Sequence, residues 1–87
     1  MPSAPNSHLL LTTPQLGQLL VSTRKLHKLT QAVVATRVGL SQNRISHLEK
    51  HPEEISVKQL LSWCSVLELE LRLGERDTFA ASNVAEW

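Results

Sequence analysis

The chain has 87 residues, enough for one small domain with a modest core but too few for a deep enzyme cleft together with a second module. It contains no run of about 18 apolar residues that could span a bilayer, and its N-terminus lacks the basic region and the long apolar stretch of a signal peptide. Cys64 is the only cysteine, which excludes an internal disulfide and a thiolate zinc cluster. We therefore expect a cytoplasmic protein that gains stability by oligomerising.

The net charge of +1 conceals a division along the chain. Residues 1–52 hold six Lys and Arg residues against one acid, a net charge of +5 with His neutral, whereas residues 53–87 hold three against seven acids, a net charge of −4. A surface that is merely solvated usually mixes the two signs. The division therefore favours attraction of the N-terminal part to a polyanion such as nucleic acid.

The first 26 or so residues predict an arm followed by a helix. Residues 1–11 read as a loose arm, within which Leu9 to Leu11 could pack as a short extended segment. Thr12 or Thr13 can cap the helix, with Pro14 near its start, where a missing N–H costs nothing. The helix should run to about His27, and its apolar stripe consists of Leu16, Leu19, Leu20, Thr23 and Leu26.

Two short helices should follow around a tight turn. Thr30 caps the first of them, which reaches Val38 and is buried through Val34, Ala35 and Val38. Gly39 suits the left-handed position that ends a helix without a steric penalty. Ser41 then caps the second, which is anchored by Ile45 and Leu48 and ended by Pro52.

A fourth helix has the strongest start signal. Ser56 and Gln59 have the spacing of a capping box, and Ile55 can pack onto Leu60. The apolar face should then continue through Leu60, Leu61, Cys64 and Leu67, with Cys64 as a small core residue. Trp63 should lie in the core or in a dimer interface.

In "LELELRL", residues 67–73, the period changes from helical to alternating. Alternation predicts a strand with one buried face. Because a lone strand has unpaired edges, we expect it to pair with its copy in an antiparallel ribbon about a twofold axis. The dimerisation residues would be Leu67, Leu69, Leu71 and Leu73. Alternatively the fourth helix simply continues, since Leu and Glu also favour helices.

Gly74 ends this element, so that residues 12–74 form the domain and residues 75–87 a flexible tail. The tail ends in Trp87, and tryptophan is enriched among the residues that dominate protein interfaces. Trp87 would therefore bind a partner, or else it lies in a disordered end or folds back on its own domain.

The two short helices predict a DNA-reading unit. At about 100° per residue, Gln42, Asn43, Ser46 and His47 share an arc of about 140° opposite the buried Ile45 and Leu48. Amide, hydroxyl and imidazole groups on such an arc can bind base edges in a DNA major groove, and no acid is present there to repel phosphate. The competing interpretation is a plain helical bundle with a polar surface, which explains neither the charge division nor the acid-free arc.

The stretch "TQAVVATRVGLSQNRISHLEK", residues 30–50, resembles the helix-turn-helix of the Cro/repressor family. The resemblance implies that Gln31 and Ser41 contact phosphates or the groove edge and that Arg44 and Lys50 flank the base-reading residues on phosphates. It also implies a structural pair between Arg24 and Glu49. Two features depart from the family pattern: Val33 stands where a polar residue is common, and "KHP" replaces the usual glycine after Glu49.

No catalytic constellation is apparent in the sequence, so we expect no enzyme activity and no cofactor. His47 and His51 are four residues apart, a spacing that can bind zinc, but without an obvious third ligand we interpret them as polar surface residues and expect no metal.

The order of the elements, with the "EKHPEEIS" loop, the "LELELRLGE" strand and the final "EW", is similar to HipB-like antitoxins over nearly the whole chain. That resemblance implies a homodimer that represses its own operon, binds an inverted-repeat operator with half-sites roughly 34 Å apart, and neutralises a HipA-like serine/threonine kinase toxin, with Trp87 anchoring the tail in the toxin. The alternatives are a stand-alone phage-type or restriction-system regulator without a toxin partner, and a pure interaction module that does not bind DNA.

Overall fold

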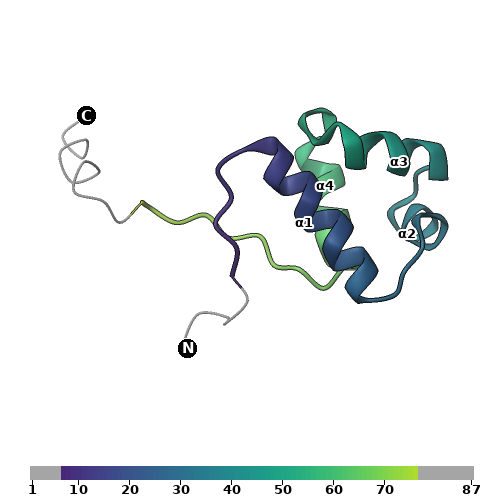
Figure 1. Cartoon of the computed structure of the whole chain (residues 1–87), viewed down its shortest axis with the longest axis horizontal. Coiled ribbons are helices and arrows are strands. Elements are labelled where there is room, and N and C mark those ends of the chain that lie inside the picture. Colours follow the sequence, from purple (N-terminus) through teal and green to yellow (C-terminus); the bar gives the residue numbers. More distant parts are fainter. Residues whose placement is uncertain (1–6, 77–87) are drawn as a thin grey trace.

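The computed structural model describes residues 7–76, which form a bundle of four α-helices with one short 3-10 helix (Figure 1). The elements are α1 (Thr13–Leu26), α2 (Gln31–Val38), α3 (Gln42–Lys50), η1 (Pro52–Glu54) and α4 (Val57–Val66). The prediction of a mainly helical domain is thereby confirmed. Figure 1 shows α2 and α3 at one end of the bundle, while the chain segments before α1 and after α4 leave from the opposite end.

Side-chain caps fix where each α-helix begins. The Thr12, Thr30, Ser41 and Ser56 hydroxyls each accept a hydrogen bond from the backbone N–H three residues further on. Such caps satisfy N–H groups that have no partner inside a helix. The capping box of Ser56 and Gln59 is present as predicted, and a second one joins Thr12 to Gln15.

The core lies between all four helices. α2 packs against both α3 and α4, and α1 packs against α3 and η1. Trp63 is completely buried, as the core interpretation predicted, and Cys64 is buried next to it. Burial raises the pKa of the Cys64 thiol, which keeps it neutral among apolar neighbours. The core cluster consists of Leu20, Val34, Ala35, Ile45, Leu48, Trp63 and Leu67.

Two helices are followed by a residue other than glycine whose backbone is in the left-handed conformation. Lys28 after α1 and Glu68 after α4 both have φ of 58°. In each case the next residue donates its N–H back to the helix, Leu29 to the Arg24 carbonyl at 3.0 Å and Leu69 to the Cys64 carbonyl at 2.7 Å. Both leucines then pack against the core. This hydrophobic contact offsets the cost of placing a residue with a Cβ in the left-handed region.

Three leucines lie differently from the sequence prediction. Leu26 is 78% exposed, because the chain turns at residues 27–28 and Leu29 packs against the core. Leu61 is 51% exposed and lies outside the buried face of α4. Leu67, predicted to lie on the dimerisation strand, instead caps α4 and is completely buried in the monomer core.

Residues 69–76 continue without helical structure, so the alternative in which α4 runs on is wrong. Within the described part of the chain these residues have no strand partner. Leu69 still packs against the core, whereas Leu71 and Leu73 are 42% and 96% exposed. Pairing of this segment with a second copy therefore stays a prediction, with its start moved from Leu67 to Leu69.

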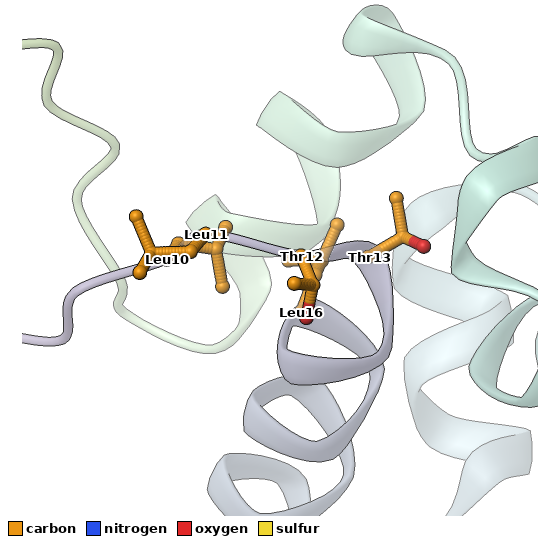
Figure 2. Close-up of a pocket in the computed structure, with 5 residues that line it drawn as sticks. All are labelled: Leu10, Leu11, Thr12, Thr13 and Leu16. Carbon is orange, nitrogen blue, oxygen red and sulfur yellow. The ribbon is translucent and has the colours of Figure 1, made fainter.

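The described part of the N-terminal arm is extended and exposed. Leu10 and Leu11 lie over the first turn of α1 and, with Thr12, Thr13 and Leu16, line a shallow, open pocket (Figure 2). Over residues 7–76, no helix combines the length and the hydrophobicity that a membrane crossing requires.

A glycine brings α1 close to the end of α3. Gly17 is buried, and a Cβ added there would lie 2.9 Å from the Glu49 carbonyl oxygen and 3.0 Å from Pro52 Cγ. The first of these neighbours is backbone, so it cannot rotate away. Gly17 therefore sets the distance between α1 and the segment that follows α3.

We predict that Gly17→Ala lowers the free energy of unfolding by about 1–2 kcal/mol, because the strain of overpacking exceeds the gain in helix propensity. Chemical denaturation at fixed protein concentration measures this change. Gly74→Ala is the matched control, since nothing lies within 4 Å of a Cβ there, and it should change stability by less than about 0.5 kcal/mol. Equal stability of the two variants would contradict the close contact.

Candidate nucleic-acid interface

The candidate interface is built on α2, α3 and the turn between them. Gly39 ends α2 with φ of 90°, and both Gly39 and Leu40 donate their N–H groups to the Ala35 carbonyl, at 2.8 and 2.9 Å. Ser41 then caps α3 at once. Because only three residues separate the two helices, the turn holds α3 firmly against α2, with one face of α3 directed outward.

The two faces of α3 differ sharply in burial. Ile45 and Leu48 are completely buried, and Glu49 is buried beside them. On the other face Gln42, Asn43, Arg44 and Lys50 are exposed and Ser46 is half-buried. Among the described residues, no other group hydrogen-bonds the side chains of Gln42, Asn43 or Ser46. Their donors and acceptors are therefore available to a ligand, as the amphipathic pattern predicted.

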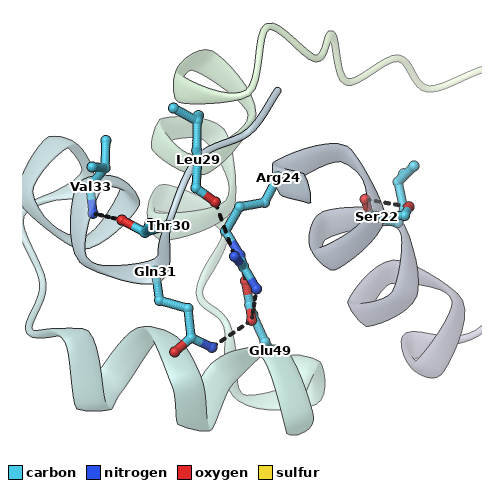
Figure 3. Close-up of polar contacts among 8 residues, drawn as sticks. Ser22, Arg24, Leu29, Thr30, Gln31, Val33 and Glu49 are labelled. Carbon is cyan, nitrogen blue, oxygen red and sulfur yellow. Dashed lines mark hydrogen bonds and ion pairs between the residues drawn. The ribbon is translucent and has the colours of Figure 1, made fainter. Parts of the chain in front are cut away.

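Behind α3, the buried Glu49 carboxylate joins three helices (Figure 3). Arg24 on α1 donates from Nε to Glu49 Oε2 at 2.7 Å and from Nη2 to Oε1 at 3.2 Å. The third nitrogen of the guanidinium, Nη1, donates to the Leu29 carbonyl at 3.1 Å. The two charged side chains are only 11% and 4% exposed. The structural pair that the family resemblance implied is therefore present, and it also binds the loop between α1 and α2.

Gln31, a predicted contact to DNA, takes part in the same network. Its amide Nε2 donates to Glu49 Oε1 at 2.9 Å, which links the start of α2 to the end of α3 (Figure 3). One of its two amide protons is thereby used inside the protein, and the other remains able to reach a phosphate. Ser41 is similar, because its oxygen accepts the Arg44 N–H at 3.1 Å while its own proton stays free to donate.

His47, predicted to read bases, is held by a neighbour that sequence reasoning missed. Its Nε2 lies 2.9 Å from Glu54 Oε1, and its ring centroid is 4.6 Å from that of His51. The hydrogen bond from His47 is the main cause that lowers the pKa of Glu54; desolvation opposes it, and the charges of His47, His51 and Arg44 add to it. A DNA contact through His47 Nε2 would have to displace Glu54.

The basic and acidic parts of the sequence are only partly separated in the folded protein. η1 packs against α3, so Glu53 and Glu54 lie beside the C-terminal turn of the candidate reading helix. Glu68 and Glu70 belong instead to the segment that leaves the bundle from the end opposite to α3 (Figure 1). The exposed cations Arg37, Arg44 and Lys50 lie on α2 and α3.

A shallow, open pocket on the outer face of α2 is lined by Ala32, Val33, Thr36 and Arg37. Val33, the residue that departs from the family pattern, therefore lines this pocket. Trp87, predicted to anchor a partner, lies outside the described residues, as does most of the predicted tail.

Comparisons with known proteins agree with this geometry. The model of the Helix-turn-helix family matches residues 21–73. A chain of a solved assembly, described as "Structure of HipA-HipB-O2-O3 complex", superposes with a TM-score of 0.72 at 24% sequence identity, over 78% of this chain and 96% of that chain. At this identity the likeness shows that the two chains share a fold. No curated protein matches the sequence significantly.

We predict that Glu49→Ala lowers the free energy of unfolding by about 3–5 kcal/mol, because it leaves the Arg24 guanidinium buried without its partner. Glu70→Ala is the control: Glu70 also pairs with an arginine, Arg72 at 3.0 Å, but both side chains are more than half exposed, so the loss should be at most about 1 kcal/mol. Urea titration followed by tryptophan fluorescence or circular dichroism separates the two. Losses of similar size would show that the buried pair is not structurally critical.

Proposed function

This chain belongs to the Helix-turn-helix family and carries a DNA-binding domain of the Cro/repressor type, and on that premise we propose that it is a dimeric, sequence-specific repressor that acts as a HipB-like antitoxin to a HipA-like serine/threonine kinase. The family membership covers DNA binding and regulation. Dimerisation, autorepression and the toxin partner are the further parts of the proposal.

The observation that carries the DNA part is the uncommitted polar face of α3. Gln42 and Asn43 are exposed on its first turn and make no side-chain hydrogen bond within residues 7–76. Amides of this kind can form paired hydrogen bonds with adenine in the major groove. Arg44 and Lys50, both exposed, lie at the two ends of the helix, where they can bind phosphates and set its register.

The dimer rests on the segment that follows α4. Leu71 and Leu73 are exposed at alternate positions of an extended chain, although their counterpart Leu69 is packed against the core. In an antiparallel ribbon, two such segments would bury these leucines and pair their free backbone groups. The twofold axis would place two α3 helices on half-sites about one helical turn apart, so the operator should be an inverted repeat.

The antitoxin part has two supports. The order of elements and the closing "EW" of the sequence are similar to HipB-like antitoxins. The fold also matches nearly the full length of a chain from the HipA-HipB-O2-O3 complex. In this proposal residues 75–87 are the toxin-binding tail and Trp87 is its anchor, since tryptophan readily fills interface pockets.

We predict that Gln42→Ala and Asn43→Ala each relax base preference at one operator position by about 1–3 kcal/mol, whereas Lys50→Ala weakens binding to all sequences and reduces the salt slope by about 1. Selection of sites from random DNA, followed by titrations at several salt concentrations, measures both effects. Lys58→Ala, an exposed lysine on α4, is the control and should change neither. Unchanged specificity in both α3 variants would contradict the assignment of α3 as the reading helix.

The toxin partner has its own test. We predict that the full-length protein, used as bait in nuclease-treated lysate of its source organism, captures a HipA-like kinase, and that a chain ending at Gly74 captures much less of it. A Trp87→Ala variant should show a similar loss, while still binding DNA. If neither full-length nor truncated protein retains a kinase, the antitoxin part fails and the stand-alone regulator remains.

A further inference from the structure

Four side chains with metal-binding chemistry gather where α3 ends and η1 begins. His47 lies in the last turns of α3, His51 is the residue between α3 and η1, and Glu53 and Glu54 belong to η1. His47 Nε2 lies 2.9 Å from Glu54 Oε1, and His51 Nδ1 lies 3.5 Å from Glu53 Oε2. One ligand atom each of His51, Glu53 and Glu54 lie within 4.8 Å of one another. We call these four residues the His–Glu cluster.

The fold holds the backbone of the cluster in place. The Glu54 N–H donates to the His51 carbonyl at 3.0 Å and the Ile55 N–H to the Pro52 carbonyl at 3.1 Å, which closes the turn of η1. Pro52 is buried, and its ring is one of the groups closest to Gly17 on α1. The carboxylates are therefore brought back over the end of α3 by a turn that is anchored to the core.

We propose that the His–Glu cluster is a binding site for one divalent transition-metal ion of the zinc type. The imidazole of His47 on α3, that of His51 just after the helix, and the carboxylates of η1 supply the nitrogen and oxygen ligands that Zn²⁺ prefers. The third ligand that the sequence did not reveal is supplied by η1. Zinc ligands lie about 2.0–2.2 Å from the ion. The ligand atoms of His51, Glu53 and Glu54, which lie within 4.8 Å of one another, therefore need to move closer together, and His47 joins them from its position against Glu54.

The exposure of the cluster permits that closure. The four side chains are between 42% and 55% exposed, so their rotamers are not fixed by packing. Both histidines already have a ring nitrogen facing a carboxylate, His47 at hydrogen-bond distance from Glu54 and His51 at 3.5 Å from Glu53, and a metal ion would bind between these atoms. The two glutamates also balance the charge of a divalent ion. The positive charge of Arg44, which acts on Glu54, would repel the ion and so weaken its binding.

The donor set also determines which metals fit. Mg²⁺ and Ca²⁺ prefer shells made only of oxygen, and the cluster offers two carboxylates beside two imidazoles. Cys64, the one cysteine, is buried in the core and belongs to a different part of the fold. The cluster is therefore a site for ions that accept mixed nitrogen and oxygen ligands.

A bound ion would also affect the DNA interface, and this consequence rests on the proposed function. His47 cannot use the same nitrogen to ligate a metal and to contact a base. The metal would hold the His47 ring against η1, so we expect Zn²⁺ to weaken operator binding. The site itself does not depend on DNA binding.

Calorimetric titration of the untagged, full-length protein with Zn²⁺, and with Co²⁺ followed by visible absorption, tests the proposal without DNA. We expect one ion per chain and no sulfur-to-cobalt charge-transfer band. His51→Ala and Glu54→Gln should each raise the Kd at least about tenfold. His27→Ala removes another exposed histidine at the end of a helix and should leave the Kd unchanged.

Circular dichroism of each variant establishes that it is folded. The absence of saturable Zn²⁺ binding overturns the proposal, as does binding that is equally tight in His51→Ala and the wild type. Tighter binding of Mg²⁺ than of Zn²⁺ would overturn the assigned class of metal. Because the titration contains no DNA, a failure here is distinguishable from a failure of the proposed repressor function.

Discussion

The arrangement of the DNA-binding unit depends on one buried ion pair, that between Arg24 and Glu49. Desolvating two charges is expensive, and their attraction offsets that cost only when the geometry is good and the remaining hydrogen-bonding groups are satisfied. Here the guanidinium also binds the Leu29 carbonyl, and the carboxylate also accepts from Gln31. The pair thus determines how α1, α2 and α3 sit relative to one another, which apolar contacts alone specify less strictly.

The helices were predictable because their start and stop signals are local. Thr30, Ser41, Ser56 and Gly39 act within one turn of the backbone, and the helix limits they predict agree with the structure. The ends of α1 and α4 were harder to predict. Lys28 and Glu68 adopt left-handed geometry because the leucine after each one packs into the core, and that contact is visible only in three dimensions. The positions of Leu26 and Leu67 relative to the core follow from the same helix ends.

For the candidate site, the sequence likewise predicted which residues are exposed but not which partners they bind. Helical periodicity placed Gln42, Asn43 and Ser46 on the outer face, and the structure agrees. It could not show that Gln31 binds Glu49 or that His47 binds Glu54, because those partners are 18 and 7 residues away and depend on how the chain folds back. The pairing of residues 69–73 with a second copy and the role of Trp87 stay predictions, since one depends on another chain and the other lies outside the described residues.

The unengaged side chains on α3 have a consequence for how such a protein can evolve. Gln42, Asn43 and Ser46 contribute no side-chain hydrogen bond to the described fold, so substitutions there can alter which operator is recognised with little loss of stability. A duplicated gene could therefore diverge to a new operator through these three positions alone. Gln31 and His47 are less free to change, because each is tied to a neighbour. Paralogues in one genome should accordingly differ first at residues 42, 43 and 46, which would insulate their regulatory circuits from one another.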